Sequence, residues 1–252
     1  MYSTENINNL DNLDNINGKY KYKAETHLHT SQASACAWNT GAEMARAYEN
    51  SGYCAIVVTD HFFNGNSSIG RVGSDGKNYA WDKRISLFMK GYEDAKREGD
   101  KIGLDVYFGF EYNSSGTEFL IYNYGEEKLR NYPEIVSDKL ETVLAKIRNE
   151  GGFIIHAHPY REAPYISQPG RLFPDYADAV EVINAHNRNA LNKLALEYAE
   201  EYNLIKFSGT DSHSVMSHDG GLAFPRKPES LCDITDMTRR KDYMLLGEQF
   251  LK

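Results

Sequence analysis

The chain has 252 residues, of which 41% are hydrophobic and 25% are charged, and its formal net charge is −8 at pH 7. This composition is typical of a globular protein, and the length suits one large α/β domain or two small ones. The negative charge argues against an extended nucleic-acid footprint, which needs clustered lysine and arginine. No apolar run reaches the ~18 residues of a membrane span, so we also expect no membrane partner.

The first 18 residues, MYSTENINNLDNLDNING, are polar and rich in asparagine. They lack the basic start and apolar middle of a signal peptide. We therefore expect a disordered tail over 1–18 and one folded domain over 19–252. The three cysteines, Cys36, Cys54 and Cys232, form no motif and cannot all pair. A cytoplasmic protein is the simplest interpretation, and the sequence leaves the oligomeric state open.

Seven apolar segments of strand length follow one another along the chain, at 22–30, 54–61, 105–112, 117–124, 152–159, 178–185 and 205–213. Apolar residues recur at helical spacing between several of them, at 41–51, 136–149 and 188–203. Strands that alternate with helices predict parallel β/α units, and their continuous apolar character indicates that both faces are covered. Seven such strands favour an α/β barrel over a short open sheet, with long loops at 64–80 and 214–230.

Nearly every predicted strand carries a histidine or an acidic residue at or near one end. These residues are His27 and His29, Asp60 and His61, Glu111, Glu118, His156 and His158, Glu181 with Asn184, and Asp211 with His213. In an α/β barrel the carboxyl ends of the strands meet at one mouth, where active sites lie. Alternate residues of a strand point to the same side, so each pair spaced by two offers two ligands to one space.

Imidazoles and carboxylates without paired thiolates favour zinc, manganese or iron. A catalytic zinc ion needs only three protein ligands, so eight or more candidates predict two or three divalent ions with a bridging carboxylate. One His-x-His pair alone is more often ordinary packing, but packing does not explain the whole pattern. The strong ligand candidates are His27, His29, His61, Glu111, His158, Asp211 and His213. Asp60 and His156 either bind metal or support the ligands.

These motifs resemble those of the PHP family, the polymerase and histidinol phosphatase domain. The matching segments are HLHT (27–30), VTDH (58–61), GFE (109–111), HAHPYR (156–161), EVINAHN (181–187) and SGTDSH (208–213), in the family's order over most of the chain. The resemblance implies a distorted (β/α)7 barrel of the TIM-like kind. It also implies two or three metal ions at the mouth and a phosphoesterase activity.

The resemblance further implies how the ligands are shared. One ion would be held by His27, His29, Glu111 and Asp211. Glu111 would bridge to a second ion held also by His158, and His61 with His213 would hold a third. Glu118 stands where many family members have a histidine and is a further ligand candidate.

The segment after HLHT departs from the family pattern. Ser34 and Ala35 occupy places where members often have another ligand, and Cys36 follows. Cys36 is therefore either an inert loop residue or a thiolate ligand of the third ion. A thiolate there would favour zinc.

The predicted reaction is hydrolysis of a phosphate ester by a metal-activated water, with Glu111 holding the ions that neutralise the developing charge. Arg161 either binds a phosphate oxygen or is a surface arginine, and His186 either contacts substrate or begins a helix. His213 or His61 protonates the leaving alkoxide if it is not fully committed to metal. We expect a small phosphorylated substrate, such as a sugar phosphate, histidinol phosphate or nucleotide.

Two alternative functions stay open at this stage. An exonuclease or oligonucleotide phosphodiesterase would suit the 18 tyrosines, which can stack on bases, but no basic, aromatic-rich strip is evident. A non-catalytic metal-stabilised or ligand-sensing domain would be expected to show gaps in the His, Asp and Glu set, which the sequence does not. Specificity is expected in the loops at 62–82, 160–177 and 214–230.

Overall fold

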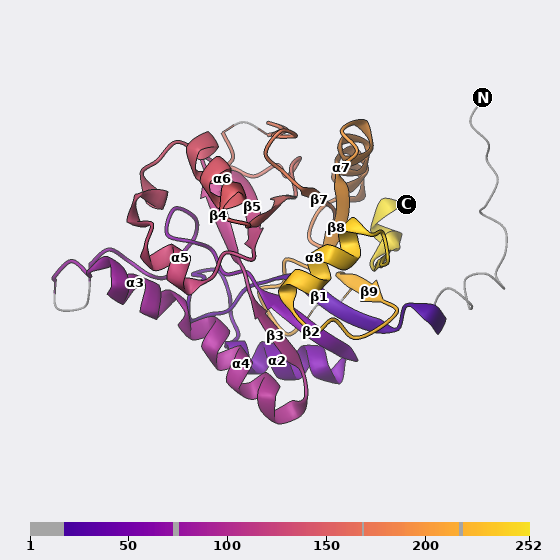
Figure 1. The fold of residues 1–252 in the computed structure, drawn as a ribbon, viewed down its shortest axis with the longest axis horizontal. Helices are drawn as coiled ribbons and strands as arrows, with labels where there is room; N and C mark the ends of the chain where they lie inside the picture. The colour runs from indigo at the N-terminus through magenta and orange to yellow at the C-terminus, as the bar shows by residue number, and fades with distance from the viewer. Residues whose placement is uncertain (1–17, 73–75, 168, 217–218) are drawn as a thin grey trace.

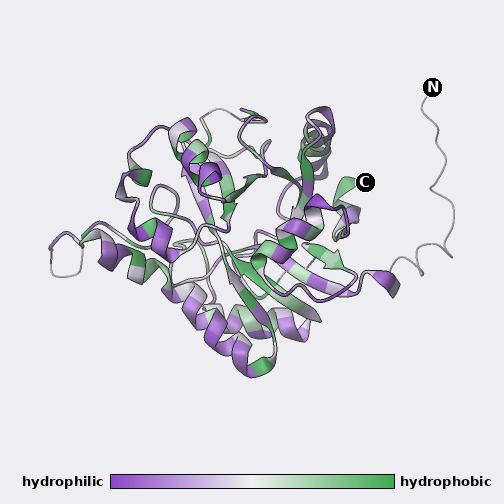
Figure 2. Cartoon of the chain, in the orientation of Figure 1, coloured by the Kyte–Doolittle hydropathy of each residue, from purple (hydrophilic) through white to green (hydrophobic). Residues whose placement is uncertain are grey.

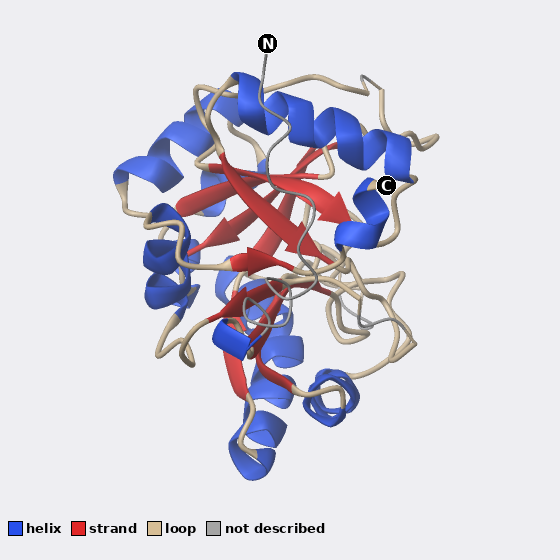
Figure 3. Ribbon diagram, turned by 90° about the vertical axis from the view of Figure 1, so that its right-hand side faces the viewer, coloured by secondary structure: helices blue, strands red, loops and turns tan. Residues whose placement is uncertain are grey.

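The structure is a computed structural model that describes residues 18–72, 76–167, 169–216 and 219–252. All but the last residue of the tail expected over 1–18 lies outside the described residues. The described chain forms a mixed α/β fold in which helices cover the outside of two sheets (Figures 1 and 3). None of the helices in these ranges has the length and apolar character needed to cross a bilayer.

The first sheet has the strand order β10-β9-β1-β2-β3. Its strands are β1 (Tyr22–Leu28), β2 (Tyr53–Val58), β3 (Asp105–Phe108), β9 (Leu222–Phe224) and β10 (Met244–Leu245). The three longer strands are parallel, as the sequence predicts, whereas β9 runs antiparallel to both β1 and β10. The segment 214–230, expected to be a loop, therefore contributes a strand, β9, that lies between β10 and β1.

The second sheet has the order β4-β5-β6-β7-β8. Its strands are β4 (Phe110–Ser114), β5 (Thr117–Tyr122), β6 (Phe153–Ala157), β7 (Ala179–Asn184) and β8 (Ile205–Gly209). Strand β5 runs antiparallel to both of its neighbours, and β6, β7 and β8 are parallel. The β4-β5 hairpin departs from the regular β/α alternation that we expected.

The single strand predicted at 105–112 is divided at Gly109 between the two sheets. A side chain at this position would lie 2.9 Å from the Tyr122 ring and 3.1 Å from the Ile121 carbonyl oxygen. The chain therefore needs a glycine where it passes from β3 to β4.

We expected a distorted (β/α)7 barrel of the TIM-like kind, and the described residues form a mixed α/β fold without a closed barrel. Their ladders make two separate five-stranded sheets. Single β-bridges, Leu28 to Ser212 and His61 to Glu111, pair segments that follow strands of one sheet with segments of the other. The strands and their order along the chain can be predicted from the sequence. Whether one sheet continues into the next cannot, because this depends on a few backbone hydrogen bonds between strands.

Three predicted helices are confirmed, as α2 (Gly41–Asn50), α6 (Leu140–Asn149) and α7 (Asn189–Glu201). Helix α2 begins at a capping box, in which the Thr40 hydroxyl accepts from the Glu43 amide and the Glu43 carboxylate accepts from the Thr40 amide. The helices not predicted are α3 (Trp81–Phe88), α4 (Lys90–Ile102), α5 (Glu126–Arg130), α8 (Leu231–Arg239) and the 3-10 turns at Pro133–Val136 and Glu248–Leu251.

The apolar core has one cluster between strands and helices and another made mainly of strand residues from both sheets, and most strands are coloured hydrophobic in Figure 2. Strands β5, β6 and β7 are buried along their whole length. This burial covers both faces, as the continuous apolar sequence predicts. Ionisable side chains in such strands are costly to bury unless they are paired, so the acidic and histidine residues at their ends mark a specialised region.

Candidate metal centre

The histidines and carboxylates gather at one end of both sheets. The carboxyl ends of β1, β2, β6 and β8 lead to His29, His61, His158 and Asp211. Glu111 lies near the start of β4, and the reversed direction of β5 brings Glu118, near its first residue, to the same end. The predicted convergence of strand ends is thus present even though the barrel is not closed.

His27 and His29 point to the same space, as strand alternation predicts. Their Nε2 atoms are 3.1 Å apart. Asp211 Oδ1 lies 3.3 Å from His27 Nε2 and 3.0 Å from His29 Nε2. Glu111 adds its two oxygens at 3.4 Å from His27 and 3.6 Å from His29.

Glu111 is the centre of the cluster, because its carboxylate also faces two histidines from other segments. Oε2 lies 2.6 Å from His61 Nδ1, and Oε1 lies 3.1 Å from His158 Nε2. Glu118 stands behind His158, with Oε2 at 3.7 Å from Nε2 and Oε1 accepting from Asn113. One carboxylate therefore reaches toward four imidazoles, the arrangement expected of a bridging ligand.

Within the described residues, four groups have ligand atoms that lie within 4.8 Å of one another. They are His29/His61/His213, His27/His29/Glu111, His27/His158/Asp211 and His61/Glu111/Glu118. All eight residues that we predicted as ligands occur in these groups. Cys36, Asp60 and His156 do not.

Two residues that the sequence prediction did not assign orient the ligands. Glu181 Oε1 bonds His27 Nδ1 at 2.8 Å, and its Oε2 accepts from the His158 amide at 3.1 Å. The Ser34 hydroxyl lies 3.2 Å from His29 Nδ1. These contacts direct Nε2 of His27 and His29 into the cluster. The signal for Glu181 was a single charge in the otherwise apolar strand AVEVIN.

Asp60 supports the site from outside the ligand cluster. Its Oδ1 accepts from the Thr30 amide and the Ser34 hydroxyl, both at 2.6 Å, and its Oδ2 accepts from the Thr30 hydroxyl at 2.6 Å. Burial raises the pKa of Asp60 to about 6, against the lowering effect of these hydrogen bonds. Asp60 thereby fixes the loop that follows His29, in the supporting role that was one of its two predicted alternatives.

Two ligand candidates stand on unusual backbone. His158 has φ of 27° and Asp211 has φ of 55°, in the left-handed region that residues with a Cβ seldom adopt. Such conformations persist where the surroundings impose them, most often at functional sites. Gly209, the last residue of β8, also lies close to the cluster, because a Cβ there would come within 2.6 Å of both Glu181 Oε1 and His27 Cβ.

His156 does not share the space of His158. Its ring stacks on Phe119 at 4.9 Å and contacts Phe173 and Tyr198 edge-on. The strand ends at Ala157, and the left-handed turn at His158 redirects the second imidazole. Burial, followed by the charge of His158, lowers the pKa of His156 to about 3, so it is a neutral core residue.

Arg161 and His186 lie at the edge of the cluster. Arg161 Nη2 bonds Asp211 Oδ2 at 2.6 Å and Asn184 Oδ1 at 2.9 Å, and its Nε donates to Asn187 at 3.1 Å. It is therefore not an unpartnered surface arginine. His186 Nδ1 bonds the Thr210 carbonyl oxygen at 2.6 Å, and its ring centroid is 6.4 Å from that of His213.

Cys36 lies at the outer side of the cluster, beside His61 and His213. Burial raises the pKa of its thiol, but hydrogen bonding and charge from these two imidazoles outweigh burial and lower the pKa to about 6. The loop that carries Cys36 is held to His213 by a backbone bond from the Trp38 amide to the His213 carbonyl oxygen, at 2.8 Å.

The pKa values of the residues in the cluster depend strongly on the charges of their neighbours. Burial raises the pKa of Glu111, yet the charges of His61 and His27 outweigh it and hold the pKa well below its usual range. Burial lowers the pKa of His29, and the charges of His61 and His213 lower it further. Neighbouring groups therefore favour an ionised Glu111 and a neutral His29. For His27 and His61 burial lowers the pKa, but the nearby carboxylates outweigh it and raise the pKa well above the usual range, so these two imidazoles must lose a proton when they bind an ion.

Two buried atoms of the cluster lack hydrogen-bond partners among the described residues, which also suits the binding of cations. His61 Nδ1 and Glu111 Oε2 are buried and lie 2.6 Å apart, and neither atom has a hydrogen-bond partner elsewhere in the described part of the chain. Buried polar atoms are normally satisfied. A divalent ion would satisfy both atoms, and the surrounding nitrogen and oxygen donors are those of zinc, manganese or iron sites.

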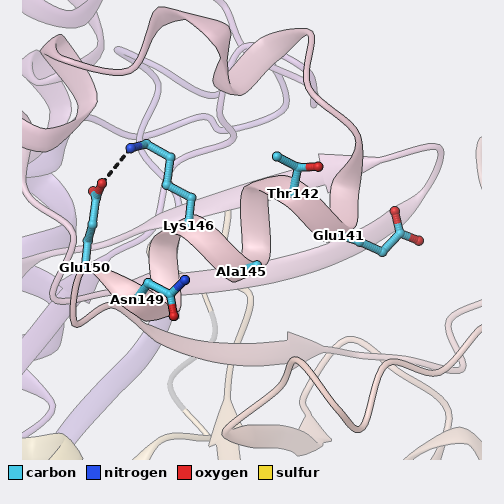
Figure 4. Close-up of a pocket in the computed structure, with 6 residues that line it drawn as sticks. All are labelled: Glu141, Thr142, Ala145, Lys146, Asn149 and Glu150. Atoms are coloured by element: carbon cyan, nitrogen blue, oxygen red, sulfur yellow. Dashed lines mark hydrogen bonds and ion pairs between the residues drawn. The ribbon is translucent and has the colours of Figure 1, made fainter.

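Another hollow on the surface has a different character. It follows the exposed side of α6 and is lined by Glu141, Thr142, Ala145, Lys146, Asn149 and Glu150 (Figure 4). Lys146 and Glu150 form an ion pair across it at 2.6 Å. None of these residues belongs to the histidine cluster, and paired surface charges of this kind are common on helices. The cluster at the strand ends is therefore the candidate site.

The chain is similar to known proteins in its structure, but sequence comparison finds no match. No protein-family model matches the chain, and no curated protein is a significant match. The fold is similar to that of a two-domain protein from Bacteroides vulgatus that contains a predicted PHP-like metal-dependent phosphoesterase, with a TM-score of 0.62 at 15% identity. That similarity covers 91% of this chain and 65% of the other, so the chain spans less than two thirds of the two-domain protein.

Two further solved structures share the fold. One is a candidate metal-dependent phosphoesterase from Bifidobacterium adolescentis, with a TM-score of 0.51, 15% identity and coverage of 88% of this chain and 95% of the other. The other is an amidohydrolase from Chromobacterium violaceum with bound sulfate and no metal, with a TM-score of 0.50, 12% identity and coverage of 76% and 88%. The resemblance to PHP-like phosphoesterases is confirmed at the level of the fold.

Proposed function

We propose that this chain is a metal-dependent phosphoesterase that hydrolyses a small phosphomonoester. The observation that carries the proposal is the Glu111 carboxylate, which faces four imidazoles and belongs to two of the four ligand groups. A buried carboxylate in such surroundings suits a ligand shared by two cations. The fold similarity to proteins described as metal-dependent phosphoesterases supports the same function.

The proposed site holds two or three divalent ions of zinc, manganese or iron. The first would be bound by His27, His29, Glu111 and Asp211, the second by Glu111, Glu118 and His158, and the third by His61 and His213. When bound, such ions supply an activated water at neutral pH and positive charge for the phosphate oxygens.

In the proposal, Arg161, His186 and His213 position the substrate and the metal ligands. Arg161 holds Asp211 and Asn184 through Nη2, and in the proposal its Nη1 donors bind a phosphate oxygen. His186, beside His213, contacts the leaving group. His213 donates Nδ1–H to the Asp211 carbonyl oxygen at 2.8 Å, so its Nε2 is the atom that either binds an ion or protonates the leaving oxygen.

A substrate panel tests the proposal. Protein loaded with manganese or zinc is assayed against sugar phosphates, histidinol phosphate, nucleotides, dinucleotides and oligonucleotides. We expect turnover of phosphomonoesters that falls by orders of magnitude in His158→Ala, with the fold retained by circular dichroism, because His158 is a ligand. The Glu197→Gln variant, on the exposed side of α7, is the matched surface control.

The other outcomes discriminate between functions. Faster cleavage of oligonucleotides than of monoesters would replace the proposal with a phosphodiesterase. Stoichiometric ion binding without turnover of any substrate in the panel would indicate a metal-stabilised or ligand-sensing domain. Unchanged turnover in His158→Ala would refute the assignment of this site.

A further inference from the structure

Asn184 is a fully buried residue at the end of β7, and its backbone is held from α7. Its amide donates to Asn192 Oδ1 at 3.2 Å, and its carbonyl oxygen accepts from Asn192 Nδ2 at 3.1 Å. Asn192 is itself fully buried. The last residue of the strand is therefore fixed from outside the histidine cluster, and its side chain remains for contacts with the cluster.

The side-chain amide of Asn184 joins anionic and cationic groups. Nδ2 donates to Glu181 Oε2 at 3.0 Å and to Asp211 Oδ2 at 3.4 Å. Oδ1 accepts from Arg161 Nη2 at 2.9 Å and from the His186 amide at 3.0 Å. The donor meets carboxylates and the acceptor meets N–H groups, so all four contacts agree with one orientation of the amide. The reverse orientation would place donor against donor at Arg161.

Three side chains fix the orientation of the Arg161 guanidinium. Its Nη2 contacts Asn184 Oδ1 and, at 2.6 Å, Asp211 Oδ2, and its Nε donates to Asn187 Oδ1 at 3.1 Å. None of these three contacts uses Nη1. A guanidinium is planar and its donors have fixed directions, so contacts at Nε and Nη2 also determine where Nη1 points. The side chain is 18% exposed, so part of it is accessible to a ligand.

We infer that Asn184 is a positioning residue that directs Nη1 of Arg161 to the phosphate of the substrate and so confers a preference for phosphomonoesters over phosphodiesters. This inference rests on the proposed function and deepens it. A monoester has one more terminal oxygen than a diester and, near neutral pH, more negative charge, and both favour binding to a guanidinium. Asn184 itself does not touch the substrate and acts through Arg161.

Two stable ligands measure this preference without catalysis. Methylphosphonate has the three terminal oxygens of a monoester, and dimethyl phosphate has the two of a diester. Asn184→Leu keeps the size of the side chain and removes its donor and acceptor. In protein saturated with Mn²⁺, this variant should bind methylphosphonate about 10- to 100-fold more weakly, as expected when a hydrogen bond to a charged group is lost. Its affinity for dimethyl phosphate should stay within about twofold of wild type.

The control for this measurement is Asn149→Leu, at the exposed end of α6. It should bind both ligands as wild type does. Elemental analysis should show the same number of ions in wild type, Asn184→Leu and the control, because Asn184 belongs to none of the four ligand groups.

A double-mutant cycle with Arg161→Ala separates positioning from a general effect on the fold. If Asn184 acts through Arg161, adding Asn184→Leu to Arg161→Ala should change methylphosphonate affinity by less than about twofold. Effects that multiply would show that Asn184 and Arg161 act independently, and they would overturn the inference.

Asn184→Asp is a second variant, which keeps the acceptor for Arg161. Its other oxygen would take the place of Nδ2, 3.0 Å from Glu181 Oε2 and 3.4 Å from Asp211 Oδ2, so like charges would meet. This variant should therefore bind Mn²⁺ more weakly than Asn184→Leu does, yet bind methylphosphonate more tightly once it is saturated with Mn²⁺. The opposite order for methylphosphonate would overturn the role of the Asn184 acceptor.

The outcomes separate this inference from the proposed function. Wild-type methylphosphonate affinity in folded Asn184→Leu protein, or equal losses for both ligands, would overturn the role of Asn184 alone. Loss of ions from this variant at saturating Mn²⁺ would also overturn it, because Asn184 would then support the metal centre rather than Arg161. Failure of wild-type protein to hydrolyse any phosphomonoester, with the methylphosphonate results as expected, would refute the proposed function and leave the position of Arg161 as inferred.

Discussion

Replacing Glu111 with glutamine is the most direct test of the metal centre. The substitution keeps the size of the side chain but removes the negative charge and one of the two oxygens that face the imidazoles of the site. Each interaction with a charged partner contributes about 1.5–3 kcal/mol. Glu111 belongs to two ligand groups, so Glu111→Gln should cost about 3–6 kcal/mol of ion binding, roughly a 10²- to 10⁴-fold loss of affinity.

The control for this measurement is Glu118→Gln. Glu118 belongs to one ligand group, lies 3.7 Å from His158 Nε2 and already accepts from Asn113. Its replacement should therefore weaken ion binding less than Glu111→Gln does. Calorimetric titration with Mn²⁺ gives affinity and stoichiometry for both variants, and hydrolysis of an aryl phosphate gives the rate. Wild-type ion affinity and wild-type hydrolysis in a folded Glu111→Gln protein would refute the reasoning.

Chelation with EDTA should lower the melting temperature, because ions that bind only the native state at 100 times Kd contribute about 2.7 kcal/mol. Equal melting temperatures in calorimetry with and without chelator would contradict a native metal site. His156→Phe should leave the metal content unchanged and alter the free energy of unfolding by less than about 1.5 kcal/mol, since the ring packs on Phe119. Loss of an ion by elemental analysis would instead make His156 a ligand. Gly209→Ala should lower the free energy of unfolding by about 1–3 kcal/mol and weaken ion binding, because its Cβ would meet Glu181 and His27 at 2.6 Å. Denaturant titration and metal titration measure the two effects, and wild-type values in both would show that the close approach is relieved without consequence.

The ligands could be predicted from the sequence where a regular strand carries them to the site. His27 lies in β1 and His29 directly follows it, and their Nε2 atoms meet at 3.1 Å, as two-residue alternation predicts. The same rule was wrong for His156 and His158, because His158, which also directly follows its strand, adopts positive φ. A single positive φ directly after a strand is enough to redirect a side chain.

The elements that the sequence did not reveal have weak apolar periodicity or depend on distant partners. Helix α4 buries only Gly91, Ala95 and Gly99, since it packs closely against α2 at Gly41. Small residues of this kind give no helical pattern of apolar side chains. Strand β9 has three residues and exists because β1 and β10 pair with it. The support from Glu181 was also hidden, because its two partners are more than 20 residues away in sequence.

The division of the strands into two sheets has a consequence for how ions enter and leave. Each of the four ligand groups combines residues in or just after β1 or β2 of the first sheet with residues in or just after strands of the second sheet, such as Glu111, His158 or His213. An ion bound by such a group would therefore link the two sheets, at the end where the Leu28–Ser212 bridge also joins them. Separation of the sheets at this end would then be coupled to release of the ion. Amide hydrogen exchange at this bridge should then slow as a larger fraction of the protein holds an ion. The residence time of the ion should likewise depend on how readily the two sheets separate.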